Sequence, residues 1–79
     1  MHYVYLLRSE ETKELYYGYT ANLKRRLKEH NAKGKLALIY YEAYLSESDA
    51  RERENKLKHY GQTRTRLKNR LKASLKSQN

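Results

Sequence analysis

The chain contains no cysteine, and this absence excludes a disulfide framework, a thiolate metal site and a cysteine nucleophile. It also lacks proline, has only three glycines and contains no repeated or low-complexity segment, so we see no linker and no internal repeat. No run of about 18 apolar residues exists to span a bilayer, and the N-terminus lacks the pattern of a secretory signal. We therefore expect a cytoplasmic protein that has no membrane partner.

Every aromatic side chain is a tyrosine, because the nine Tyr are accompanied by no Phe and no Trp. A tyrosine ring is buried as readily as that of Phe, but its hydroxyl needs a hydrogen-bond partner when it is buried. We expect most of these rings to fill the core. A domain this small also places several rings near its surface, where their hydroxyl groups can take part in chemistry.

Positive charge is in excess, since 18 Lys and Arg against nine Asp and Glu give a formal charge of +9 on 79 residues. Residues 51–79 carry ten basic and two acidic groups and so hold +8 of that total. Like charges on neighbouring turns of a helix repel each other by roughly a few tenths of a kcal/mol per pair, and nearby phosphates would relieve that repulsion. The distribution predicts a polyanionic partner.

Two segments rich in β-formers, residues 2–8 and 14–19, predict a β-hairpin at the N-terminus. If the loop between them has an even number of residues, such as 9–12, Tyr5 falls directly opposite Tyr16. Residues paired in this way share a face of the sheet. The hairpin would then present two tyrosine hydroxyls side by side.

A helix is predicted to follow the hairpin and to run to about His30, with Thr20 or Asn22 as its N-cap. Leu23 and Leu27 recur at the helical spacing within it. The next apolar run, residues 36–44, predicts a third strand.

A second helix is predicted over residues 47–59, opened by a variant capping box of Ser46 and Asp49. Gly61 is expected to end it in a left-handed conformation. A basic helix at about residues 63–77 completes the chain, and the resulting order is ββαβαα. We expect one α+β domain over residues 1–79.

The first helix carries two polar groups beside its apolar stripe. Leu23, Arg26, Leu27 and His30 share one face, because residues three and four apart are neighbours on a helix. Arg26 and His30 are either ordinary boundary residues with their polar groups in water or functional groups held next to the sheet. Spacing alone leaves both interpretations open.

The second helix places a carboxylate on its apolar side, since Ala50, Glu54 and Leu57 share a face. A partly buried carboxylate must be neutralised, paired with a base or bound to a cation, or it costs several kcal/mol. Glu54 therefore either forms a salt bridge with a nearby Lys or Arg or serves as an oxygen ligand for a hard divalent cation such as Mg²⁺.

Together these side chains suit phosphodiester hydrolysis. A metal ion bound by Glu54 would polarise the phosphate, and Arg26 would hold the phosphate and stabilise its developing charge. Tyr5, Tyr16 or His30 would accept the proton of the attacking water. A phenol is a poor base at neutral pH unless a nearby cation stabilises its anion, which both the metal and Arg26 would do.

Two tripeptides and one helical segment carry a family resemblance. Residues 3–5 (Tyr-Val-Tyr) and 16–18 (Tyr-Tyr-Gly) stand where GIY-YIG endonucleases have their two name-giving motifs, although neither is literal, and residues 20–31 look like the first helix of that family. The chain resembles a small stand-alone bacterial GIY-YIG domain over about residues 3–60. The resemblance implies a three-stranded antiparallel sheet flanked by helices, with a single divalent metal ion.

The resemblance also implies roles for individual residues. Arg26 stands at the position of the family's catalytic arginine, and His30 at that of the histidine one turn later. Glu54 stands at the metal ligand, and Tyr5 or an equivalent group is the base. Tyr3 and Gly18 belong to the structural motifs, and Tyr16 opens the second motif.

The substrate implied by the resemblance is DNA, which basic residues outside the motifs would hold. Those expected to contact it are Lys24, Arg25, Lys33, Lys35, Arg64, Arg66, Lys68, Arg70 and Lys72. A domain without a separate DNA-targeting module has little means of choosing sequence. Cutting both strands would require two copies, so a homodimer is among the expected partners.

Our leading hypothesis is an endonuclease that uses Mg²⁺ or Mn²⁺ and selects DNA by structure rather than by sequence, with a role in repair or recombination. The alternative is a non-catalytic nucleic-acid-binding module with a degenerate nuclease site. A third hypothesis is a protein-interaction domain that binds an acidic partner through exposed tyrosines.

Overall fold

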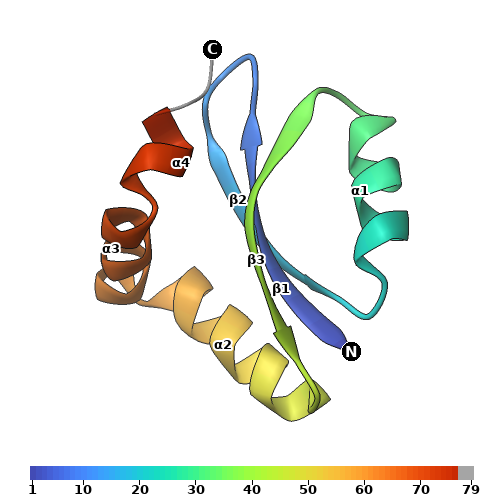
Figure 1. The fold of residues 1–79 in the computed structure, drawn as a ribbon, viewed down its shortest axis with the longest axis vertical. Helices are drawn as coiled ribbons and strands as arrows, with labels where there is room; N and C mark the ends of the chain where they lie inside the picture. Colours follow the sequence, from blue (N-terminus) through green and yellow to red (C-terminus); the bar gives the residue numbers. More distant parts are fainter. Residues whose placement is uncertain (77–79) are drawn as a thin grey trace.

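The computed structural model describes residues 1–76 as a three-stranded antiparallel sheet with helices on both faces (Figure 1). The strands are β1 (His2–Ser9), β2 (Leu15–Thr20) and β3 (Leu36–Tyr44), and the helices are α1 (Leu23–Asn31), α2 (Glu47–His59), α3 (Gly61–Arg70) and α4 (Lys72–Lys76). The strand order is β2-β1-β3, so the first strand of the chain lies in the middle. The predicted α+β fold with the order ββαβαα is confirmed, the last helix being divided into α3 and α4.

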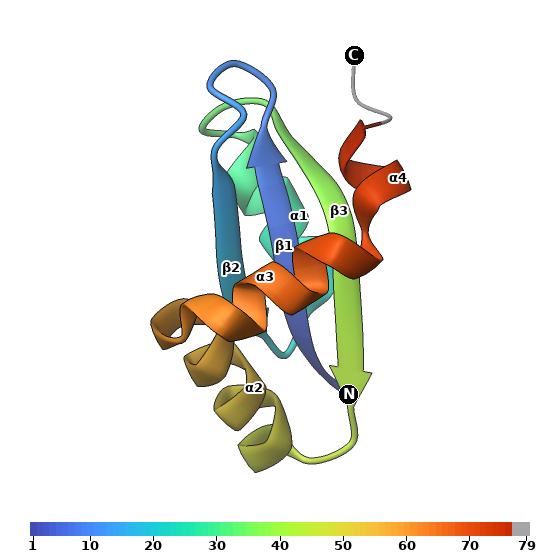
Figure 2. The same cartoon turned by 90° about the vertical axis from the view of Figure 1, so that its left-hand side faces the viewer.

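The two faces of the sheet have different covers. Helix α1 alone lies over one face, whereas α2, α3 and α4 lie over the other, as the two perpendicular views show (Figures 1 and 2). The well-packed core is on the second face, where four residues are at most 2% exposed: Val4, Ala50, Leu57 and Leu67. The three larger side chains, those of Val4, Leu57 and Leu67, each stabilise the fold by about 1.5–3 kcal/mol when they are fully buried. Among the described residues, no helix combines the length and the apolar character needed to cross a membrane.

The hairpin forms as predicted, but its register differs. Tyr5 lies opposite Gly18, so the prediction that it pairs with Tyr16 is wrong. The turn lies one residue later than expected, since the N–H of Ser9 donates to the carbonyl oxygen of Glu14 at 2.9 Å and residues 10–13 replace residues 9–12 as the loop, with Lys13 in a left-handed conformation at φ of 66°. The shift amounts to two residues, and side chains alternate with a period of two, so Tyr16 remains on the face that carries Tyr5.

The first two helices begin where the sequence predicts, but only α1 has a side-chain N-cap. The side chain of Asn22 accepts the backbone N–H of Arg25 at 3.0 Å and caps α1. Ser46 precedes α2 without forming a side-chain cap, because its hydroxyl is hydrogen-bonded to the hydroxyl of Ser48 at 2.9 Å. The predicted capping box with Asp49 is therefore wrong.

The end of α2 also differs from the prediction. Tyr60 leaves the helix in an extended conformation with φ of −121°, and Gly61 begins α3 without adopting a positive φ. A glycine C-cap is unnecessary because Arg64 Nη1 donates to the carbonyl oxygens of Leu57 and Lys58 at 2.9 and 3.0 Å.

The predicted C-terminal helix over residues 63–77 is not continuous. It starts earlier, in α3, and is interrupted at Leu71, whose φ of −108° and ψ of 27° are not helical. α4 resumes after this residue and ends at Lys76. Residue 77 lies outside the described residues.

Candidate active site

Three polar side chains predicted from the sequence meet between β1 and α1. The Nε–H group of Arg26 donates to the hydroxyl oxygen of Tyr5 at 3.3 Å, and that oxygen lies 3.2 Å from Nε2 of His30. Arg26 and His30 are four residues apart on α1, so one helical turn brings both over the strand. Tyr5 itself is only 4% exposed. We call this arrangement the Tyr5–Arg26–His30 trio.

The trio combines a proton acceptor with a permanent cation. Burial, together with the positive charges of Arg26 and Lys33, lowers the pKa of His30 below its ordinary value, so its imidazole is neutral at pH 7. Hydrogen bonds to Tyr5 and Glu29 raise the pKa of Arg26, which stays charged. Since Arg26 donates to the Tyr5 oxygen, the hydroxyl proton of Tyr5 is directed towards the neutral Nε2 of His30.

Tyr16 has a different environment from Tyr5. It lies on β2, is 44% exposed and donates its hydroxyl to Oε1 of Glu14 at 3.0 Å. This hydrogen bond and the negative charge of Glu14 raise the pKa of Tyr16. Tyr16 therefore remains protonated at neutral pH and serves as a hydrogen-bond donor. The sequence left the choice of base open among Tyr5, Tyr16 and His30, and the geometry favours the buried trio.

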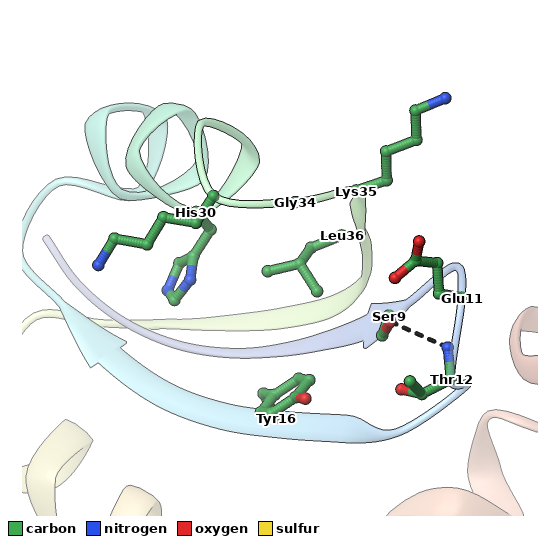
Figure 3. Close-up of a pocket in the computed structure, with 9 residues that line it drawn as sticks. Ser9, Glu11, Thr12, Tyr16, His30, Gly34, Lys35 and Leu36 are labelled. Atoms are coloured by element: carbon green, nitrogen blue, oxygen red, sulfur yellow. Dashed lines mark hydrogen bonds between the residues drawn. The ribbon is translucent and has the colours of Figure 1, made fainter.

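A pocket of about 400 Å³ opens beside the trio. Figure 3 shows that His30 enters it from α1 and Tyr16 from β2. Lys33 and Lys35 line it from the loop between α1 and β3. Figure 3 shows the side chain of Lys35 extending away from His30 and Tyr16, and the carboxylate of Glu11 also lines the pocket. Lys33 and the phenol of Tyr16 are the lining groups that can donate hydrogen bonds to a phosphate group there.

Glu54 is separated from the trio by the sheet, since α2 and α1 cover opposite faces (Figures 1 and 2). Its carboxylate pairs with Nζ of Lys58 at 3.0 Å, and its side chain is 18% exposed. The structure thus forms the salt bridge that was one of the two interpretations of this residue. It confirms that Glu54 shares the inner side of α2 with the buried Ala50 and Leu57.

The donor groups present are compatible with one kind of metal site only. Within residues 1–76 no three His, Asp or Glu side chains gather at one point. A structural zinc site or a calcium cage would require such a group. A single half-buried carboxylate such as Glu54 fits Mg²⁺, which keeps several water ligands and shares substrate phosphates.

The basic residues predicted to contact nucleic acid are divided between two sides of the molecule. Lys24, Arg25, Lys33 and Lys35 lie on α1 and the loop after it, whereas Arg64, Arg66, Lys68, Arg70 and Lys72 lie on α3 and α4 (Figure 2). All are exposed except Arg64, whose guanidinium holds the end of α2. The largest concentration of positive charge is therefore on the side opposite the trio.

A polar network on β3 was not predicted from the sequence. Oxygens of Glu42 accept hydrogen bonds from the hydroxyls of Tyr40 and Tyr44 and from two nitrogens of Arg53 on α2, the latter at 3.0 Å. Burial and the bond to Glu42 raise the pKa values of both tyrosines to about 12. Spacing of two along a strand puts Tyr40, Glu42 and Tyr44 on one face, which was the available signal. The network fastens β3 to α2.

Comparison with known proteins identifies the family to which this fold and site belong. Residues 1–69 match the GIY-YIG catalytic domain, and the chain belongs to that family. It is similar to UPF0213 proteins: 35% identical over 68 residues to one from Haloquadratum walsbyi, covering 75% of each chain. A second, from Staphylococcus haemolyticus, is 38% identical over 66 residues, which cover 72% of this chain and 79% of the relative.

A solved structure supports the same assignment. The solution NMR structure of a UPF0213 protein from Bacillus halodurans superimposes with a TM-score of 0.58 at 28% sequence identity, and the match covers 84% of this chain and 79% of that one. The resemblance inferred from the tripeptides is thereby confirmed. Membership of the GIY-YIG family implies nuclease chemistry on a nucleic acid.

Proposed function

We propose that the protein is a divalent-metal-dependent endonuclease that hydrolyses phosphodiester bonds in DNA. The observation that carries this proposal is the Tyr5–Arg26–His30 trio in a chain of the GIY-YIG family. Hydrolysis of a phosphodiester requires a base for the attacking water and positive charge at the phosphate. The trio supplies both within one hydrogen-bonded group.

Tyr5 acts as the base and His30 as the acceptor of its proton. Nε2 of His30 takes the hydroxyl proton of Tyr5 over the 3.2 Å between them, and the Tyr5 oxygen then takes a proton from the attacking water. The positive charge of Arg26 at 3.3 Å stabilises the phenolate in the interval. His30 also lines the pocket, so it can return its proton to solvent.

Arg26 and Tyr16 hold the phosphate. The side chain of Arg26 is 45% exposed, so its guanidinium can donate to phosphate oxygens as well as to Tyr5. Tyr16 would add a neutral donor from the opposite wall of the pocket once its hydroxyl turns from Glu14 to the phosphate, and Lys33 and Lys35 lie on the loop that lines the pocket. These groups would act on the charge that develops on the phosphate during hydrolysis.

Glu54 is the residue that would hold Mg²⁺ or Mn²⁺. A divalent ion held there would supply positive charge to phosphates on the α2 side of the sheet and not to a phosphate held at Arg26, because α1 and α2 cover opposite faces. Lys58, the present partner of Glu54, is 47% exposed, and exposed ion pairs of this kind contribute about 0–1 kcal/mol. A cation can therefore replace the lysine at little cost.

The proposed substrate preference is for DNA structure, with low sequence specificity and a role in repair or recombination. Support comes from the character of the basic groups, which are long side chains at exposed positions of helices and a loop. Such groups contact phosphates, which carry no sequence information.

A nicking assay tests the proposal. Supercoiled plasmid and a labelled branched duplex are incubated with Mg²⁺, Mn²⁺ or EDTA, and wild type is compared with Glu54→Ala. The matched control is Glu52→Ala, which removes an exposed carboxylate of the same helix that is paired with Lys56 at the same spacing. We expect metal-dependent cleavage that is kept in Glu52→Ala. Its loss in Glu54→Ala would show that an ion at Glu54 takes part in the reaction, and its persistence would place the catalytic ion elsewhere. Intact DNA under all conditions, with salt-sensitive binding retained, would instead establish a non-catalytic nucleic-acid-binding module.

A further inference from the structure

A second pocket, with aromatic walls, lies on the same face of the sheet as the trio. The rings of Tyr3 and Tyr41 meet edge to face with centroids 6.0 Å apart. With Leu23 and Leu27 of α1 they line a pocket of about 420 Å³, and Lys24 stands at its rim. Tyr41 is 51% exposed, so its ring is not a core side chain.

This aromatic pocket adjoins the trio directly. Tyr41 is the cross-strand partner of Tyr5 in the pairing of β1 with β3. Tyr3 is two residues before Tyr5 on β1, a separation of about 7 Å along a strand, with both side chains on one face. On α1, Leu27 follows Arg26 in the chain. A group in the aromatic pocket is thus a neighbour of a phosphate held at Arg26.

The pocket offers apolar surface and aromatic faces rather than groups for proton transfer. Bases stack on aromatic side chains irrespective of sequence because every base has a π-face. An adjoining groove on α1 is lined by Asn22, Lys24, Arg25 and Lys28, and it places three cations beside the pocket. An aromatic platform next to a row of cations is the combination that holds single-stranded nucleic acid.

We infer that Tyr3 and Tyr41 bind an unpaired nucleobase adjacent to the scissile phosphate. The inference rests on the proposed nuclease function and names its substrate class: DNA with an unpaired nucleotide at the cleavage site, as in a flap, a branch or a single strand. A base inside a continuous duplex is stacked on both sides and must be extruded at a cost before it can enter such a pocket. The pocket therefore favours DNA in which the nucleotide is already unpaired and unstacked before it binds.

Binding measured without cleavage tests the inference. A flap substrate with 2-aminopurine at the unpaired position and a fully paired duplex of the same sequence are titrated in EDTA with wild type, Tyr41→Ala, Tyr41→Trp and Tyr60→Ala. Tyr60 is the matched control, since it is 58% exposed and lies between α2 and α3. Thermal unfolding of each variant shows that it is folded.

We expect wild type to prefer the flap and to quench its fluorescence by stacking. Tyr41→Ala should lose about tenfold in flap affinity, the contribution of one base–aromatic stack, while duplex affinity stays unchanged. Tyr41→Trp should retain the preference, and Tyr60→Ala should behave as wild type. An unchanged ratio of flap to duplex affinity in Tyr41→Ala would overturn the inference.

The two proposals fail in distinguishable ways, because binding in EDTA does not depend on cleavage. A protein that prefers the flap through Tyr41 but cuts no DNA would overturn the nuclease and support the base pocket. A protein that cuts DNA but whose flap preference survives in Tyr41→Ala would overturn the base pocket and leave the nuclease standing.

Discussion

Gly18 faces Tyr5 across the pairing of β1 with β2 so closely that no side chain fits between them. A Cβ atom at position 18 would lie 2.3 Å from the hydroxyl oxygen of Tyr5 and 2.4 Å from its Cζ. The Tyr5 ring is buried and its hydroxyl is hydrogen-bonded to α1, so it has little room to move aside. The glycine of the second motif thus fixes the position of the tyrosine of the first.

Gly18→Ala should therefore damage both activity and stability. We expect the displaced Tyr5 hydroxyl to leave the trio, with about a hundredfold loss of nicking rate. Overpacking should lower the free energy of unfolding by about 1–3 kcal/mol. Gly61→Ala is the control, because its Cβ would meet only Arg64 Nη2 at 3.7 Å. Urea denaturation and the nicking assay measure the two effects, and a Gly18→Ala protein with wild-type activity would refute this role of the glycine.

Removing the hydroxyl of Tyr5 and that of Tyr16 in separate variants should distinguish the roles of the two tyrosines. Tyr5→Phe keeps the buried ring but removes the base, so the single-turnover nicking rate should fall by about 10²–10⁴-fold while DNA affinity changes little. Tyr16→Phe should cost less, because Tyr16 is proposed only as a hydrogen-bond donor. Rates under saturating enzyme and parallel filter-binding assays make the comparison. Equal losses in the two variants would contradict the assignment of Tyr5 as base.

The pH below which the nicking rate falls should be set by the protonation of His30. Burial and the charges of Arg26 and Lys33 lower its pKa, so the neutral form persists below the ordinary pKa of 6.5. We expect the nicking rate to hold through pH 6.5 and to fall only at lower pH. Between the lowered pKa and 6.5 the unfolded chain binds more protons than the native one, so stability should also fall as pH falls through that window. His30→Gln should abolish this part of the pH dependence of thermal unfolding.

The Glu42 network should contribute more to the free energy of unfolding than an exposed ion pair does. Arg53→Met leaves the half-buried carboxylate of Glu42 with only tyrosine partners, and we expect a loss of about 1–3 kcal/mol in unfolding free energy. Lys56→Met breaks the exposed pair with Glu52 and should cost at most about 1 kcal/mol. Urea denaturation measures the unfolding free energy of both variants. Equal losses would show that the network stabilises the fold no more than the exposed pair does.

The network should also confer stability that acid removes. Burial acts to raise the pKa of Glu42, but the hydrogen bonds from Arg53, Tyr40 and Tyr44 outweigh it and lower the pKa below 4.5. The contribution is therefore complete above pH 4.5 and is lost as the pH falls through the lower, native value. Acid titrations of wild type and Glu42→Gln should diverge in that range.

Neutralising two arginines of α3 should weaken DNA binding and make that binding less dependent on salt concentration. The double substitution of Arg66 and Arg70 by Gln removes two cations that line a pocket between α2 and α3. Each lost phosphate contact flattens the slope of log Kobs against log salt by about 0.9, so we expect a change of about 1.8. An unchanged slope would remove α3 from the interface.

Local pattern alone determined the elements and part of the site. The limits of β3 and α2 agree with the predicted ranges, and α1 begins at the predicted cap Asn22, because strand propensity, helical period and capping are properties of neighbouring residues. The same reasoning placed Arg26 and His30 on one helical face, from which both reach Tyr5. A spacing of four residues fixes that geometry within a single helix.

Only the tertiary structure decided which distant residues meet. The partner of Tyr5 is Gly18 because the turn lies at residues 10–13, and moving a turn by one residue shifts every cross-strand pair by two. Packing of α2 and α3 gave Arg64 its place at the end of α2. Spacing along the chain cannot specify such contacts, since they depend on how elements far apart in sequence pack together. The sequence by itself therefore determined the side chains of the trio, and the fold determined how closely Gly18 faces Tyr5.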